Sequence, residues 1–306
     1  MAHETAAGQL SELCVDTLGV FRGCDAVGRG VSRRQLATLR SAGVIERLLP
    51  DTYRMTSVRP SELQTLCAAL HWAGDSAVVA GRSAGWLYGF EGVEASVPEI
   101  VVPRQIRARA PGVVVHTHTV ETRGALLRRE HRGFPVTGPE PTLVALAATL
   151  DAEAFEIACE DARRRRLTSV PALHGYLARH GRTRRAGIFV MRRLLAELDP
   201  VHPARSTLEV KTRRLLAGSG LTGFVRELPL EWNGRTYLYD FAFEESRTIL
   251  ETNGRRWHDD PADYEHDNEK WSVPGRLGYR IVFATWDKVV RHPETLLREL
   301  SATLAA

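Results

Sequence analysis

The sequence predicts an α/β (α+β) protein built from three parts. Residues 1–58 have the pattern of short helices followed by a β-hairpin, and residues 59–200 mix helical and strand-like segments. Residues 201–306 predict a helix, three strands, a helix, a strand and a final helix, in the order αβββαβα. Prolines in the segment 198–203 disfavour helix in the residues before them, so this segment is the expected linker.

Length and composition are those of a soluble globular protein. The chain has 306 residues, 43% hydrophobic and 25% charged, which is enough for two or three domains with cores of their own. No stretch has the roughly 18 apolar residues of a membrane span, and the N-terminus lacks a basic and then apolar segment. We therefore expect a cytoplasmic protein with no membrane partner. The four cysteines are scattered, which predicts reduced thiols.

The positive charge of the chain comes almost entirely from arginine. The net charge is +4 and the pI about 9.0, and lysine occurs only at positions 211, 270 and 288. Arginine suits bidentate contacts to phosphate, so the composition is compatible with a nucleic-acid partner. A bias in genomic base composition explains the same arginine excess equally well.

The first part predicts a helix and a hairpin with clear end signals. Ser32 can cap a helix that Gly43 ends in a left-handed conformation. Residues 44–49 then predict a strand, and residues 52–55 its return. This is the pattern of a winged helix-turn-helix, whose second helix contacts DNA. The expected DNA-binding residues are the arginines of this region, Arg29, Arg33, Arg34, Arg40 and Arg54. The alternative is a small helical domain with a solvated basic face.

The same region resembles the N-terminal domain of the AbiEi family, the antitoxins of type IV toxin–antitoxin systems. The likeness lies in Gly30-Val31-Ser32-Arg33-Arg34-Gln35-Leu36, Ala42-Gly43 and Tyr53-Arg54, and it continues into residues 79–89 and 134–139. This sequence has Asp51-Thr52 where the family usually has glycine before the second wing strand. The resemblance implies DNA binding, autoregulation and a toxin as partner protein. It does not imply catalysis.

The middle part carries few chemical signals. His116 and His118 alternate on one strand, and with no carboxylate nearby in the sequence we expect both on the surface or at an interface. The run Arg163–Arg166 ends a helix that begins near Glu153, where cations favour the helix dipole. A phosphate-binding patch is the alternative for this run, and Arg179, Arg182, Arg184 and Arg185 form a second candidate patch.

Acidic residues interrupt the strands predicted in the last part. Asp240 stands inside the apolar segment 237–243, and Glu251 ends the next strand. A carboxylate inside a strong strand is unfavourable without a function, and carboxylates at neighbouring strand ends can meet at one edge of the sheet. Glu209 follows Ser206 at capping-box spacing, so it is either a helix cap or part of this group.

The polar set predicts a metal-dependent phosphodiesterase centre. Mg²⁺ (or Mn²⁺) prefers hard oxygen ligands and promotes the attack of water on phosphodiesters. The expected ligands are Asp240, Glu251 and the carbonyl of Thr252. His258 can act as general base, and Asp267 can orient that histidine or hold a water molecule. Trp257 can stack on a base or wedge into a DNA duplex.

The element order and these residues resemble the restriction-endonuclease-like, or PD-(D/E)xK, fold, and more closely its Vsr-like branch with the motif EDxHD. The resemblance covers about the last hundred residues. Carried over residue by residue, the motif falls on Glu209, Asp240, His258 and Asp267, with Thr252 at the variable position. Gly254, Trp257 and His258 also match a Gly-x-x-Trp-His element of that branch. The resemblance implies metal-dependent hydrolysis of DNA without a covalent intermediate.

Two registers of the motif remain open. The conventional register takes Asp240, Glu251 and then Asn253, where a lysine is expected. The EDxHD register is favoured because it assigns the work of that lysine to His258. Two functions follow. The leading hypothesis is an Mg²⁺-dependent DNA endonuclease guided by its N-terminal half. The alternative is a non-catalytic DNA-binding autoregulator or antitoxin-like protein with a degenerate nuclease fold, because a fold does not guarantee an activity.

Overall fold

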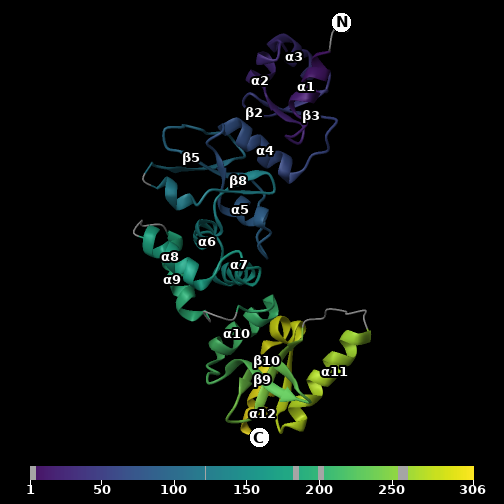
Figure 1. The fold of residues 1–306 in the computed structure, drawn as a ribbon, viewed down its shortest axis with the longest axis vertical. Helices are drawn as coiled ribbons and strands as arrows, with labels where there is room; N and C mark the ends of the chain where they lie inside the picture. Colours follow the sequence, from purple (N-terminus) through teal and green to yellow (C-terminus); the bar gives the residue numbers. More distant parts are fainter. Residues whose placement is uncertain (1–4, 121, 182–185, 199–202, 254–260) are drawn as a thin grey trace. The chain divides into compact units, whose positions relative to one another are not determined.

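The computed structural model describes residues 5–120, 122–181, 186–198, 203–253 and 261–306; side chains within 261–268 lie outside the described set. The chain divides into two compact units, Met1–Pro203 and Ala204–Ala306 (Figure 1). Both units mix helices with sheets, as the sequence predicts. None of the helices in the described ranges combines the length and apolarity that crossing a membrane requires.

The first unit begins with a winged-helix domain. Its elements are α1 (Ala6–Leu13), β1 (Val20–Arg22), α2 (Gly23–Gly28), α3 (Arg33–Ser41), β2 (Ile45–Leu49) and β3 (Thr52–Met55). The three strands form an antiparallel sheet in the order β1-β3-β2. Ser32 caps α3 in a full capping box with Gln35, and Gly43 follows α3 with a φ of +72°, so the predicted helix and hairpin are confirmed.

A mixed α/β domain follows in the same unit. Its elements are α4 (Glu62–Ala73), β4 (Val78–Val79), α5 (Gly81–Tyr88), β5 (Glu99–Pro103), β6 (Val114–His118), η1 (Arg123–Leu126), β7 (Arg129–His131), β8 (Phe134–Val136), α6 (Pro139–Leu146), α7 (Ala152–Arg164), α8 (Val170–His180) and α9 (Ala186–Glu197). The sheet order is β6-β5-β4-β8-β7, with β6 at one edge. Parallel and antiparallel neighbours alternate across it.

Helix α4 joins the winged helix to this domain. The side-chain amide of Gln64 donates to the carbonyl of Leu18 at 2.7 Å. The thiol of Cys67 donates to the carbonyl of Thr17 at 3.3 Å. Val20 of β1 belongs to the same buried core as Leu66 of α4. The winged helix is therefore packed onto the rest of the first unit.

The second unit has the predicted order of helix, three strands, helix, strand and helix. Its elements are α10 (Thr207–Ser219), β9 (Val225–Trp232), β10 (Arg235–Phe243), β11 (Thr248–Asn253), α11 (Pro261–Arg276), β12 (Arg280–Thr285), the π-helical turn η2 (Asp287–Arg291) and α12 (Pro293–Ala305). The sheet order is β12-β11-β10-β9, and only β11 and β12 are parallel. Asn233 and Gly234 both have positive φ angles, which confirms the predicted hairpin turn.

Two apolar cores cover the sheet of the second unit. One contains Phe241 and Phe243 together with residues of α10 and α12. The other contains Tyr237 and Tyr239 together with Val273 of α11. Odd-numbered residues of a regular strand share one face, yet Tyr237 and Tyr239 lie in one core and Phe241 and Phe243 lie in the other. The alternation of β10 is therefore broken at Asp240. Opposite this point Glu227 has a φ of +53°, and the regular pairing of β9 with β10 omits Asp240.

Candidate functional site

Helix α3 of the winged-helix domain and the turn before it expose arginines to solvent. Leu36 faces the domain core, whereas Arg33, Arg34 and Arg40 are exposed on α3, and Arg29 is exposed just after α2. Arg33 forms an ion pair with Asp51, although its own side chain remains 59% exposed. The helix that winged-helix proteins use for DNA therefore carries cationic side chains on its free surface.

Asp51 forms the tip of the wing without a glycine. Its φ is +53°, a left-handed conformation that Asp tolerates better than most residues. Its carboxylate accepts a hydrogen bond from the N–H of Cys24 at 2.9 Å, and its carbonyl accepts one from Gly23 at 2.8 Å. Burial alone raises the pKa of Asp51, but hydrogen bonds from Arg33 and Cys24 outweigh it and hold the pKa below its ordinary value. The departure from the family pattern thus keeps the hairpin intact.

Arg54 is engaged inside the domain. Its side chain is only 12% exposed, and it pairs with Glu46 at 2.7 Å and donates to the carbonyl of Val58 at 2.9 Å. We therefore leave Arg54 out of the DNA-contacting set expected from the sequence.

The irregularity of β10 brings the two predicted carboxylates of the second unit together. The β10–β11 pairing runs from Phe243 to Phe241, and the next backbone N–H, that of Asp240, donates instead to the Glu251 carboxylate at 3.1 Å. The Asp240 carboxylate in turn accepts a hydrogen bond from the N–H of Thr252 at 2.9 Å, and a second one from the Thr252 hydroxyl. Asp240, Glu251 and Thr252 therefore form one connected group.

The electrostatics of this group are those of a desolvated acidic pair. Glu251 is 5% exposed, and its pKa is raised from 4.5 to about 7. Burial is the main cause, and the charge of Asp240 adds to it, because two carboxylates at close range oppose each other's ionisation. The ammonium group of Lys270 acts in the opposite direction. Such perturbed carboxylates occur preferentially at functional sites.

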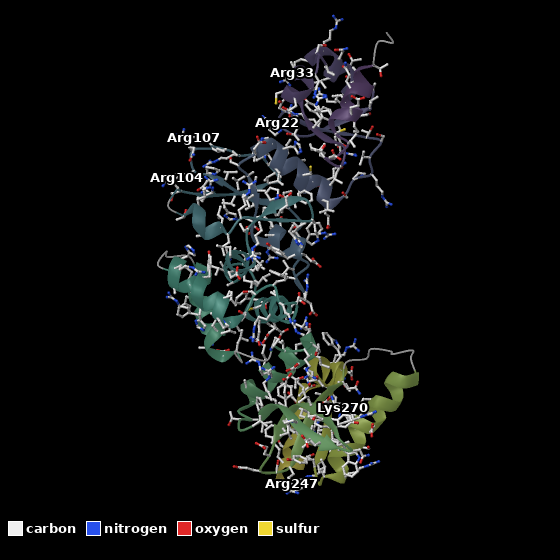
Figure 2. All side chains as sticks on the ribbon, in the orientation of Figure 1. Arg22, Arg33, Arg104, Arg107, Arg247 and Lys270 are labelled. Atoms are coloured by element: carbon white, nitrogen blue, oxygen red, sulfur yellow. The ribbon has the colours of Figure 1, made fainter. Side chains whose placement is uncertain are left out.

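Lys270 is the functional candidate that the sequence analysis missed. It lies on α11 (Figure 2). Its ammonium group forms an ion pair with Glu251. Tyr239 holds it in place from the neighbouring strand. The Tyr239 hydroxyl donates to the Lys270 carbonyl at 2.6 Å, and the Lys270 nitrogen lies 5.3 Å from the centre of the Tyr239 ring. A lysine thus accompanies the two carboxylates, although Asn253 stands at the position expected for it.

Ser206 caps α10 by accepting a hydrogen bond from the Glu209 N–H, and the Glu209 carboxylate is a neighbour of this group. Glu209 is 2% exposed in the first turn of α10 and pairs with Arg226 at 2.7 Å. Its second oxygen accepts a hydrogen bond from the N–H of Arg205 at 2.6 Å. Burial raises the pKa of Glu209 above its ordinary value, and the charge of Asp240 contributes in the same direction. Because Arg226 and Arg205 engage its oxygens, Glu209 borders Asp240 more as a support than as a free ligand.

The donor set fits a cation that retains much of its water. Across the described residues there is no group of three or more His, Cys, Asp or Glu side chains arranged to hold a metal. Mg²⁺, however, is often bound by only one or two carboxylates and keeps several waters. Asp240 and Glu251 supply two such carboxylates, and their mutual repulsion is the condition that a divalent cation relieves.

Three residues of the predicted centre lie outside the described set. Trp257 and His258 fall within 254–260, and Asp267 falls within the segment of α11 whose side chains are not described. The EDxHD register therefore stays a prediction. Asp240 is common to both registers, and it lies in the connected group described above.

One expectation for the middle region is confirmed, since His116 is exposed, and one needs correction. His118 is buried and not on the surface, since its exposure is only 7%. His116 pairs with Glu99, a carboxylate 17 residues away that the fold brings alongside. Hydrogen bonding to Glu99 raises the pKa of His116.

The arginine run at the end of α7 is also explained differently from a phosphate-binding patch. Arg163 is 5% exposed and pairs with Glu160 at 2.8 Å. Arg164 and Arg165 pair with Asp161 at 2.7 and 3.2 Å. These residues tie α7 to its own acidic side chains, so the alternative of an open patch does not apply to them. Arg182, Arg184 and Arg185 of the second candidate patch lie outside the described residues.

Comparison with known proteins finds a family likeness in the first domain. Residues 9–56 match the family model of AbiEi antitoxins, which are described as transcriptional regulators. No curated protein gives a significant match to the chain. Among solved structures, the crystal structure of RV2827C protein from Mycobacterium tuberculosis is 20% identical, covers 67% of this chain and 80% of its own, and superposes with a TM-score of 0.44.

Proposed function

We propose that the protein is a DNA-binding transcriptional regulator of the antitoxin type that holds DNA through α3 of its winged helix. The family match of residues 9–56 carries this proposal, and the exposed arginines of α3 support it. In this function the helix lies in the major groove while the wing and neighbouring arginines contact phosphates. A toxin protein is the partner that the antitoxin family suggests.

A binding assay with two α3 arginines removed tests this function. We expect Arg34→Ala/Arg40→Ala to bind a duplex from its own promoter region about 30-fold more weakly at about 0.15 M salt, since two phosphate contacts are lost. The slope of log affinity against log salt should fall by about 2. Arg193→Ala, on α9 and paired with Glu197 at 3.6 Å, is the control and should bind normally. Unchanged affinity of the double variant would exclude α3 as the recognition helix.

A second function is favoured by the group around Asp240. We infer that the second unit hydrolyses phosphodiester bonds of DNA, with Asp240, Glu251 and Lys270 as its working residues. The resemblance of the element order to restriction-endonuclease-like domains supports this, and so does the convergence of two carboxylates and a lysine. The observation that carries it is the position of Glu251, which accepts a hydrogen bond from the Asp240 N–H and pairs with the Lys270 ammonium group, and its raised pKa supports the inference.

Each residue has a distinct task in this reaction. Asp240 and Glu251 would hold a divalent cation, which would polarise the scissile phosphate. Lys270 stands beside Glu251 and can donate a hydrogen bond to a phosphate oxygen, where negative charge grows in the transition state. The general base predicted for the attacking water is His258, which lies outside the described residues. Thr252 fixes the Asp240 carboxylate through two hydrogen bonds.

Cleavage of DNA by matched variants tests this second function. Supercoiled plasmid and short duplex, mismatched and single-stranded substrates would be incubated with Mg²⁺ or Mn²⁺. We expect Asp240→Asn to lose activity by more than about 100-fold and Lys270→Met by about 10- to 100-fold. Glu269→Gln is the control on α11, because Glu269 pairs with Arg235 at 3.1 Å and not with the acidic group. Cleavage that survives Asp240→Asn would refute the assignment. No cleavage of any substrate by the wild-type protein would favour the degenerate alternative.

A further inference from the structure

The loop between β5 and β6 forms a basic groove at the edge of the second sheet. The groove has a volume of about 790 Å³, and its walls include Arg104, Arg107, Arg109, Val113, Val115 and Thr117. No acidic residue lines it. The three arginines are exposed, and Figure 2 shows Arg104 and Arg107 at the outer edge of this part of the molecule. We call this feature the arginine groove.

The arginine groove is held in shape by backbone contacts while its cations stay unengaged. The N–H of Arg104 donates to the carbonyl of His118, and the N–H of Ile106 donates to Pro103, both at 2.8 Å. Among the residues that the structure describes, the guanidinium groups of Arg104, Arg107 and Arg109 have no ion pair or hydrogen bond. Three unpaired guanidinium groups on one ordered loop create a strong local attraction for an anion.

The arginine groove is continuous with the winged helix. Ile106 and Val113 pack in one apolar cluster with Ala69 and Ala73 of α4 and with Leu49 of the wing strand β2. The wing and the groove therefore share a packing cluster. In Figure 2, Arg33 and Arg22 of the winged helix and Arg107 and Arg104 of the loop lie along the same side of the first unit.

We infer that the arginine groove is a second DNA-contacting surface, which holds the phosphate backbone of the duplex bound by α3. Arginine binds phosphate in a bidentate manner, and a groove with aliphatic walls and no carboxylate suits a continuous phosphate chain. This inference rests on the proposed DNA-binding function and extends it. The groove lengthens the bound stretch of DNA and adds affinity without reading sequence.

A simpler role for these arginines is protection of the sheet edge. Charged residues next to an exposed edge strand discourage pairing with other chains, and β6 is such a strand. That role requires charge but no particular salt dependence of DNA binding. A measurement of DNA affinity against salt separates the two roles, because the slope counts the phosphates that the protein neutralises.

The test compares three full-length variants in fluorescence anisotropy titrations. The variants are Arg104→Ala/Arg107→Ala/Arg109→Ala, the corresponding triple lysine variant, and a control that removes the same charge elsewhere, Arg193→Ala/Arg291→Ala/Arg298→Ala. The control arginines already contact their own helices. The probes are labelled duplexes of arbitrary sequence, about 15 and about 40 bp long, and titrations run from low to physiological salt. Circular dichroism confirms that each variant is folded.

The expected result is specific to the arginine groove. The triple alanine variant should bind the longer duplex about 100-fold more weakly at about 0.15 M salt, with a salt slope lower by 2 to 3, an estimate of roughly 0.9 per lost phosphate contact. The lysine variant should keep most of the slope, and the control should match the wild type. Equal affinity and slope for the triple alanine and wild-type proteins would overturn the inference. Poly-L-glutamate serves as a further probe. If the triple alanine variant loses binding to it while DNA binding is unchanged, the inference is also overturned, and the groove binds an acidic protein partner instead. If α3 variants also bind like the wild type, the proposed function itself fails.

Discussion

Glu251 makes the stability of the second unit depend on pH in a way that can be calculated. Its pKa is about 7 in the folded protein, against an ordinary value of 4.5. A group whose pKa is raised by folding contributes its full stability below the unfolded pKa and loses it as the pH rises through the folded pKa. The wild-type protein should therefore lose stability between about pH 4.5 and about pH 7, as Glu251 ionises beside Asp240.

The perturbation that isolates this effect is Glu251→Gln. A neutral amide has no ionisation, so the variant lacks this dependence on pH. The difference between pKa values of 4.5 and about 7 corresponds to about 3 kcal/mol, of which about 2.5 kcal/mol falls between about pH 5 and about pH 8. Between about pH 5 and about pH 8, the free energy of unfolding of the glutamine variant should therefore rise by about 2.5 kcal/mol relative to that of the wild type. The variant also leaves Lys270 without its partner. That cost is the same at each pH, so it does not alter how the stability difference changes with pH.

Urea unfolding followed by tryptophan fluorescence measures this change. Four of the six tryptophans, Trp232, Trp257, Trp271 and Trp286, belong to the second unit, so the signal reports mainly on it. The experiment is done without divalent cations, at several values from about pH 5 to about pH 8. Glu269→Gln is the control and should follow the wild type. If the stability difference between Glu251→Gln and the wild type is constant across this range, Glu251 is not the strained acid described above.

Further predictions follow from other contacts. Asp51→Ala should lower the melting temperature more than Asp51→Gly, because alanine loses the same hydrogen bonds and also tolerates the φ of +53° poorly, by about 1 kcal/mol. Gly187→Ala should cost about 2 kcal/mol or more in urea unfolding, since its methyl group would lie 1.8 Å from the Val144 carbonyl oxygen. Gly218→Ala, with open space around it in α10, should instead stabilise by about 0.5 kcal/mol. His116→Gln should destabilise below about pH 6.5 and have a smaller effect at higher pH, because the Glu99 contact raises the pKa of His116.

Local signals explain why several elements could be predicted from the sequence. The start of α3 follows from Ser32 and Gln35, which bond to each other within one turn. The hairpin between β9 and β10 follows from Asn233-Gly234, which adopts the positive φ angles that this turn requires. These features depend on neighbours a few residues apart. By contrast β1 is only three residues long and is held by its pairing with β3, which the local pattern does not encode.

In the candidate site, too, contacts between residues far apart in the sequence could not be predicted. Asp240 and Glu251 could be predicted because they interrupt apolar strands that are joined by a short turn. Lys270 could not, because it reaches Glu251 from a helix 19 residues later in the chain, and its position depends on how α11 packs against the sheet. The available signal was compositional, since lysine is rare in this arginine-rich chain. Glu99 and His116 were missed as a pair for the same reason, since they meet across the parallel strands β5 and β6.

The separation of the cores bears on how the two proposed activities relate. The winged helix and the arginine groove depend on apolar clusters within the first unit, whereas Asp240 and Glu251 sit between the two clusters of the second unit. A substitution that unfolds neither core should therefore affect one activity at a time. Asp240→Asn should abolish cleavage while leaving the salt slope of DNA binding at its wild-type value, because the slope counts arginines of the first unit. A changed slope in Asp240→Asn would mean that the second unit itself neutralises phosphates in the bound complex, and the count of contacts assigned to α3 and the arginine groove would have to fall accordingly.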